Sequence, residues 1–341
     1  MEKESQKIQQ QLFSFLENLS PQKKPIVNEL MTILNLSKSG AYKKLNGESN
    51  LSLDDTIKLS RHYGFSIDQF IAERHNAIPF YVDAIRRQPS SYDEYLRNIN
   101  THFEFIRGCK KVQVSYITNE VPVFHYLQFP LLFYFKLFVW NHTSWQMPQR
   151  PHRFSLSEFT NDSLLNSLMK SMLKEYFGYD GMEMWNIRFL DITLDQIKYY
   201  AHSGIFEHKE DILRIFKEVE KMSRHLKKMA EVGYKFNLEK PEEKLGHLTV
   251  HMNELVASTN IIYVNADNFN YVFTTFDPPN FIRSADDRFC NYTENWINMT
   301  KKHSLLISGA GERERERTFR LITKKIERAK QELEGILSYI Y

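Results

Sequence analysis

The feature that most constrains the fold of this chain is a series of short apolar segments between residues 26 and 71, separated by turn residues at close intervals. Leu30 and Met31 mark the apolar face of a short helix, and Asn35 follows where the chain must turn sharply. Asn tolerates the left-handed backbone conformation better than most side chains, so it suits such a turn. Ser37 is then placed as the N-cap of a second short helix. The pattern predicts two short helices joined by a tight turn.

The second helix, predicted over Lys38 to Leu45, has one apolar side and one polar side. Ala41 and Leu45 face the core, while the polar side carries three lysines and no acid between residues 37 and 47. Lysine suits phosphate neutralisation and guanine acceptors, and Ser and Tyr hydroxyls can bond phosphate or base edges. The residues that we predict to contact DNA are Ser37, Lys38, Ser39, Tyr42, Lys43, Lys44 and Asn46.

Two further segments extend the pattern, one opening at Leu51 and ending at Tyr63-Gly64, the other starting at Phe65. Over residues 26–71 the spacing resembles that of the phage-repressor (Cro and lambda-repressor-like) helix-turn-helix family. The matching pieces are Leu34-Asn35-Leu36-Ser37, Ala41, Leu51 to Leu53, Lys58-Leu59-Ser60, Gly64, Ser66, Asp68 and Phe70.

The resemblance implies an all-α DNA-binding domain whose second motif helix enters the major groove, with its N-terminal residues facing bases. Two positions depart from the family pattern. Asn35 replaces the common Gly, and Ser39-Gly40 lies inside the recognition helix, where Gly costs up to ~1 kcal/mol.

The rest of the chain is predicted to form a second, larger domain, because 341 residues exceed the usual size of one domain. The chain has 25 Phe and 18 Tyr, most of them after residue 76, which a small helical domain could not bury. Strand-like runs over 112–127 and 260–276 each read as a hairpin. Helices are expected over 207–232 and from about residue 312 to the end of the sequence.

The fold class that we predict is therefore multidomain, an all-α helix-turn-helix N-terminal domain followed by a larger α+β domain. The helix-turn-helix domain would span residues 1–75 and a helical connector residues 76–110. An α+β effector or dimerisation domain would span residues 111–341.

Charge and cysteine content narrow the class of protein further. The net charge of +3 is small, so any DNA-binding charge must be local rather than global. Cys109 and Cys290 form no CxxC motif, and the first residues are polar where a signal peptide needs an apolar run. The apolar window 129–140 falls short of the ~20 residues that span a bilayer. We expect a cytoplasmic protein without a membrane partner.

Two weaker patterns could carry chemistry but are incomplete. His247 and His251 share a face in either a helix or a strand, yet no nearby Cys or Glu completes a metal site. The segment 304–312 resembles a strand followed by a glycine turn, but lacks the third glycine of a dinucleotide fingerprint and the Lys of a P-loop. We predict no catalytic residues, no metal and no cofactor.

The function expected from these observations is that of a DNA-binding transcriptional regulator, with double-stranded DNA as partner. The family usually reads two half-sites as a dimer, so a homodimer is expected, with the helix at 207–232 or the terminal helix as its contact. A small-molecule or protein effector could act through a concave pocket near 112–127 and 260–276. We expect five aromatic residues near this pocket: Phe129, Phe133, Phe135, Phe138 and Trp140.

Two alternatives belong to other classes of protein. One is an enzyme or toxin-linked effector that carries a helix-turn-helix for targeting, and the other is a protein-interaction module. A buried cleft lined by paired carboxylates or His would favour the enzyme, whereas a closed apolar pocket would favour the sensor.

Overall fold

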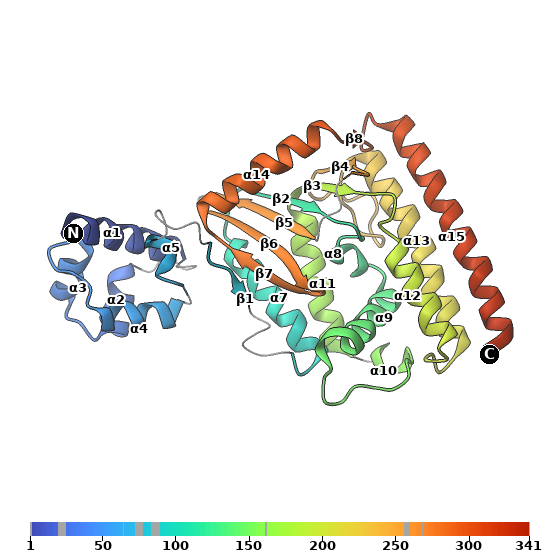
Figure 1. Ribbon diagram of the computed structural model, residues 1–341, viewed down its shortest axis with the longest axis horizontal. Coiled ribbons are helices and arrows are strands. Elements are labelled where there is room, and N and C mark those ends of the chain that lie inside the picture. The colour runs from blue at the N-terminus through green and yellow to red at the C-terminus, as the bar shows by residue number, and fades with distance from the viewer. Residues whose placement is uncertain are drawn as a thin grey trace.

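A helical N-terminal region precedes a larger region built on a mixed β-sheet (Figure 1). The computed structural model describes residues 2–19, 25–63, 65–71, 78–82, 89–160, 162–255, 260–267 and 269–340. The predicted boundary at 75/76 and Gly64 of the family pattern lie outside these ranges.

The N-terminal region is all-α within its described residues and has a hydrophobic core of its own. Its helices are α1 (Glu2–Leu19), α2 (Ile26–Leu34), α3 (Lys38–Leu45), α4 (Leu53–Tyr63) and α5 (Asp68–Ile71). Leu16 of α1, Leu30 of α2, Ala41 of α3 and Leu59 of α4 are completely buried in one cluster. Phe15, Phe65 and Phe70 pack edge to face beside it.

The larger region contains an eight-stranded sheet, in the order β1-β7-β6-β5-β2-β3-β4-β8. The central strands β2, β3 and β4 are parallel, and every other neighbouring pair is antiparallel. The strands are β1 (Tyr81–Val82), β2 (Val112–Ile117), β3 (Asp180–Trp185), β4 (Leu248–Met252), β5 (Ile261–Ala266), β6 (Phe269–Asp277), β7 (Asn280–Ser284) and β8 (Leu305–Leu306).

Helices cover both faces of this sheet (Figure 1). The α14 helix packs on one face, where Met182 and Met184 of β3 contact Cys290 and Ile297 in a small cluster. The opposite face carries the main core. The helices of this region are α7 (Tyr92–Ile106), α8 (Val123–Tyr126), α9 (Pro130–Trp140), α10 (Ser157–Thr160), α11 (Ser163–Gly178), α12 (Asp191–His202), α13 (Lys209–Val232), α14 (Asp287–Lys302) and α15 (Glu312–Ile340). A π-helical turn, Asn141–Trp145, follows α9.

One of the two predicted hairpins is confirmed and the other is wrong. The 260–276 segment forms β5 and β6, which pair antiparallel. In the 112–127 segment only β2 is a strand, because α8 starts at Val123 with Pro122 as its N-cap residue. Proline is pre-organised for a helix start, and β2 pairs instead with β3 and β5, which lie far along the sequence.

The prediction of a helical connector over 76–110 also needs correction. Tyr81 and Val82 form β1, which pairs with β7 at the edge of the sheet. The following helix, α7, buries Leu96 and Phe103 in the main core. The described part of this segment therefore packs with the sheet region.

The apolar stripes proposed for dimer contact are buried inside the chain. The stripe on α13 includes Ile215 and Met222, both without solvent exposure, and that on α15 includes Phe319 and Ile322. The two helices pack against each other, and α15 also packs on α12. These stripes follow from intramolecular packing, so they give no support to a dimer contact.

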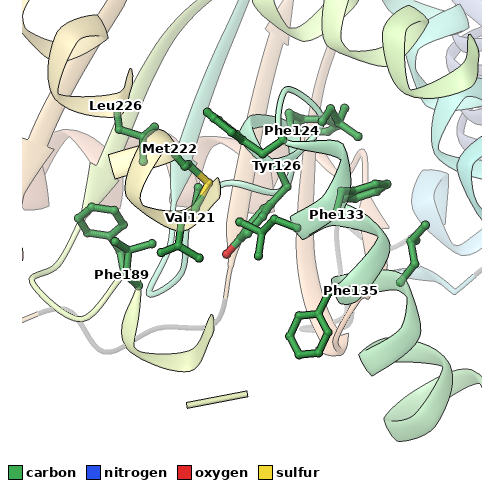
Figure 2. Packing of buried hydrophobic residues seen from close by; sticks show 14 of the residues in the cluster. Val121, Phe124, Tyr126, Phe133, Phe135, Phe189, Met222 and Leu226 are labelled. Carbon is green, nitrogen blue, oxygen red and sulfur yellow. The ribbon is translucent and has the colours of Figure 1, made fainter. Parts of the chain in front are cut away.

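The aromatic residues of α9 belong to the same core. Phe133 and Phe135 project from different sides of α9 into the main core (Figure 2). The Phe135 ring packs on the rings of Phe154, Tyr200 and Phe206. Phe133 and Phe135 are buried, as are Phe129, Phe138 and Trp140. Within the described part of the chain, no helix combines the length and the apolar character needed to cross a bilayer.

Candidate nucleic-acid interface

The turn between α2 and α3 has the geometry that its sequence predicts. Asn35 has a left-handed backbone (φ 53°, ψ 50°), and its N–H donates to the carbonyl oxygen of Met31. Leu36 N–H donates to the same oxygen at 3.1 Å. The Oγ of Ser37 accepts the N–H of Gly40 at 3.2 Å, so Ser37 caps α3. The two helices are thus joined with their terminal backbone groups partly satisfied.

Close packing holds α3 against the rest of the helical region. Ala41 has no solvent exposure, and its small side chain lets α3 approach α2 closely. The hydroxyl of Tyr63, at the end of α4, donates to the carboxylate of Glu29 on α2. The Tyr63 bond braces α2 and α4, while the burial of Ala41 fixes one face of α3 and leaves its other face on the surface.

Six of the seven residues predicted to contact DNA lie exposed on or beside α3. They are Ser37, Lys38, Ser39, Tyr42, Lys43 and Asn46. The side chain of Asn46 donates from Nδ2 to Oε1 of Glu48 at 3.2 Å, and Ser37 is engaged as the cap. Lys38, Ser39, Tyr42 and Lys43 have no side-chain hydrogen bond or ion pair to another described residue and present their polar atoms to solvent.

Lys44 occupies a different environment from its neighbours. Its Nζ lies 2.9 Å from a carboxylate oxygen of Asp55, and the two side chains are only 13% and 15% exposed. The same Nζ donates to the carbonyl oxygen of Asn50 at 2.9 Å. Gln9 of α1 donates to the Lys44 carbonyl oxygen at 2.7 Å. Lys44 therefore ties α3 to α4 and to the loop between them, while Lys38 and Lys43 remain the outward lysines.

A separate hollow lies in the sheet region, between α7 and the core-facing side of β2, β5, β6 and β7. Its volume is about 130 Å³, and most of its lining is apolar. The segments 112–127 and 260–276, near which we predicted a pocket, both contribute to its wall, for example through Phe124 and Ile262. The aromatic residues at 129–140 do not line it.

Sequence reasoning missed a buried histidine–carboxylate contact in the core, between His125 and Glu183. The His125 Nε2 lies 2.8 Å from Oε1 of Glu183, and Tyr176 and Trp185 also donate to this carboxylate. Burial alone would raise the pKa of Glu183, but the charge and hydrogen bond of His125 hold that pKa below its usual value. Both side chains are fully enclosed, so we interpret the pair as structural. The signal in the sequence was Glu183 between two methionines, Met182 and Met184, inside the buried part of β3.

The two histidines considered for a metal do not form a site together. His247 is exposed before β4, while His251 is buried within it. Among the described residues, no three His, Cys, Asp or Glu side chains come together in a way that could hold a metal ion.

Comparison with known proteins adds no family to this description. The chain matches no protein-family model, no curated protein and no solved structure. The chemistry of the site is therefore taken from its own residues.

Proposed function

We propose that the chain is a DNA-binding transcriptional regulator in which α3 enters the major groove of duplex DNA. The observation that supports this most directly is the α2–turn–α3 unit. Asn35 makes a left-handed turn, Ser37 caps the second helix, Ala41 is buried at the helix contact, and the opposite face of α3 carries free polar side chains. This arrangement is what a helix-turn-helix needs to present one helix to a groove.

The exposed side chains divide by chemistry. Lys38 and Lys43 would neutralise phosphates, which gives affinity that depends on salt but little on sequence. Ser39 and Tyr42 carry hydroxyls that can bond base edges, and they would contribute sequence preference. Lys44 has its charge compensated by Asp55, so we assign it to holding the helix in place.

A homodimer remains part of the proposal, since one helical region of this size contacts only a short stretch of duplex. The apolar faces of α13 and α15 are already buried within the chain, so the dimer would use other surfaces.

The apolar hollow beside α7 favours a sensor over an enzyme for the larger region. Its wall is mostly apolar, with a few polar side chains, which is the usual make-up of small-molecule binding sites. Among the described residues no carboxylate lines the hollow, and His102 is the one histidine in its wall, so the paired carboxylates that would favour an enzyme are not seen there.

Selection from random duplex DNA with the full chain tests the proposal. Wild-type protein should enrich a short motif, and Ser39→Ala and Tyr42→Phe should each change the enriched bases while DNA is still retained. A fourth selection with Leu213→Ser, an exposed change on α13, serves as the control and should return the wild-type motif. Failure of wild-type protein to enrich any sequence would contradict specific DNA binding.

A further inference from the structure

The hollow beside α7 has apolar walls on nearly every side. Ile99 and Phe103 of α7 face Val264 of β5 and Phe273 of β6 across it. Its lining also includes Asn98, which is exposed, so the hollow extends towards the protein surface. Binding is favoured when an apolar group replaces water in a space of this kind, because apolar surface is removed from water.

In the part of the chain that the structure describes, one permanently charged group borders this hollow, the guanidinium of Arg283 on β7. Its Nε is buried and has no hydrogen-bond partner in the structure. Among the described residues no carboxylate lies within ion-pairing distance of Arg283. Its guanidinium instead lies 4.7 Å from the ring centre of Tyr81 and 6.0 Å from that of Tyr271.

Arg283 as a whole is half-buried, but its Nε is buried without a hydrogen-bond partner, and an unsatisfied buried polar atom is costly. The planar fork of Arg matches the two oxygens of a carboxylate, and hydrogen bonds between such charged groups are about twice as strong as neutral ones. The missing partner therefore has a definite chemistry, an anion carried on an apolar body.

The size of the hollow limits that body. Its volume is about 130 Å³. A dry engineered cavity of ~150 Å³ accommodates benzene. The space thus suits one aromatic ring or an aliphatic chain of similar volume, with the charged group placed at Arg283.

We propose that this hollow is the binding site for a small apolar monocarboxylate, with the carboxylate paired to Arg283 and the ring or chain enclosed between α7 and the sheet. We further propose that binding is coupled to the helical N-terminal region, a part of the inference that rests on the proposed function in DNA binding.

The coupling route is a short series of contacts through β1. Tyr81 pairs directly with Arg283 across the β1–β7 ladder, and the Arg283 guanidinium covers its ring. The Tyr81 hydroxyl accepts the N–H of Ser66, just before α5, at 3.1 Å. A ligand that draws Arg283 towards its carboxylate changes the packing of Tyr81, and so the contact that Tyr81 makes with the helical region.

Benzoate is the first probe, with hexanoate as an aliphatic acid and benzyl alcohol as a neutral molecule of similar shape. Ligand-observed NMR and titration calorimetry on the full chain should show saturable binding of an acid. Benzyl alcohol should bind at least about tenfold more weakly, since a hydrogen bond between charged groups is lost. Absence of saturable binding by both acids would overturn the proposal.

Two variants locate the site. Arg283→Gln should weaken acid binding by roughly 10- to 100-fold and leave benzyl alcohol binding unchanged, which also shows that the hollow is intact. Ile99→Phe fills the space while keeping Arg283, so it should abolish binding of both molecules. Arg107→Gln removes an exposed, ion-paired arginine outside the hollow and should bind like wild type. Equal acid affinity in Arg283→Gln and wild type would contradict the role of Arg283.

The coupling is tested separately, by fluorescence anisotropy of a duplex DNA with and without saturating benzoate. We expect at least a several-fold change in DNA affinity, absent in Ile99→Phe and reduced in Tyr81→Phe. Unchanged affinity would overturn the coupling but not the binding site. A chain that binds benzoate but no DNA would overturn the proposed function and leave the carboxylate site standing.

Discussion

Lys44 is one of three lysines that the sequence groups together, but in the structure it does not join the exposed lysines of α3. Its Nζ is compensated by Asp55 and by the Asn50 carbonyl. We predict that Lys44→Ala destabilises the helical region by roughly 1–2 kcal/mol, since Asp55 is left half-buried without its cation. Hydrogen exchange of peptides from residues 26–71 measures this loss of stability. Lys43→Ala, an exposed neighbour, is the matched control, and equal protection in the two variants would refute the structural role of Lys44.

The second prediction at the residue scale concerns the pH dependence of stability, which two buried histidines should influence. Burial lowers the pKa of each below its ordinary value. The pKa of His225 is lowered to about 3 and that of His251 to about 4. The Nε2 of His225 lies 2.8 Å from Nε2 of Gln128, an amide nitrogen that only donates, so the imidazole must accept and stay neutral.

The direction of the pH effect follows from these values. Below about pH 6.5 the unfolded chain binds protons at both histidines before the folded chain does, so the free energy of unfolding falls as pH falls. The drop should approach, but not exceed, about 1.4 kcal/mol per pH unit for each histidine between pH 6 and 5. All four Trp lie beyond residue 139, so Trp fluorescence during urea unfolding reports on the sheet region.

The control for this pH dependence is a pair of single variants. His225→Gln keeps an acceptor for Gln128 but cannot titrate, so its pH dependence should be shallower than that of wild type. His303→Gln, at an exposed position, should leave the slope unchanged. A His225→Gln protein with the wild-type slope would show that His225 does not titrate on unfolding.

At the scale of elements, local signals predicted some segments well and others poorly. The α2–turn–α3 unit was predictable because its cap and its turn residue act within a few positions, at Ser37 and Asn35. The helix α8 was not, because its alternating pattern suits a strand and only Pro122 indicated a helix start. The partners of β2 lie on distant segments, which no local pattern reveals.

Gly40 within α3 gives a prediction for this element. A Cβ added at Gly40 would lie 3.4 Å from Ser37 Oγ, an ordinary contact distance, whereas glycine weakens a helix interior. Gly40→Ala should therefore stabilise the helical region by up to ~1 kcal/mol. Gly47 has φ +74° at the end of α3, where a side chain is strained, so Gly47→Ala should destabilise by about 1 kcal/mol. Hydrogen exchange of peptides covering residues 38–50 measures the effect of each substitution. Destabilisation by Gly40→Ala would contradict the space described around Gly40.

At the scale of the whole molecule, the sequence predicted a helical N-terminal region and a larger mixed region, and the structure has both. The candidate DNA-contacting residues could be predicted from the sequence because they lie close together, on or beside one short helix. Arg283 was not, because its importance comes from pairing with Tyr81 across β1 and β7, some 200 residues apart in the chain. The proposed carboxylate site exists only once the sheet is assembled.

The central claim is that the exposed face of α3 contacts the DNA backbone and bases. The most direct measurement is the affinity of the full chain for its selected duplex by fluorescence anisotropy, from roughly 50 to 300 mM salt. We predict that the logarithm of the association constant falls linearly with the logarithm of salt concentration, and that Lys43→Ala reduces the slope by ~0.9. Lys209→Ala, exposed at the start of α13, should keep the wild-type slope. A Lys43→Ala protein with the affinity and slope of wild type would contradict the assignment of α3 to the DNA interface.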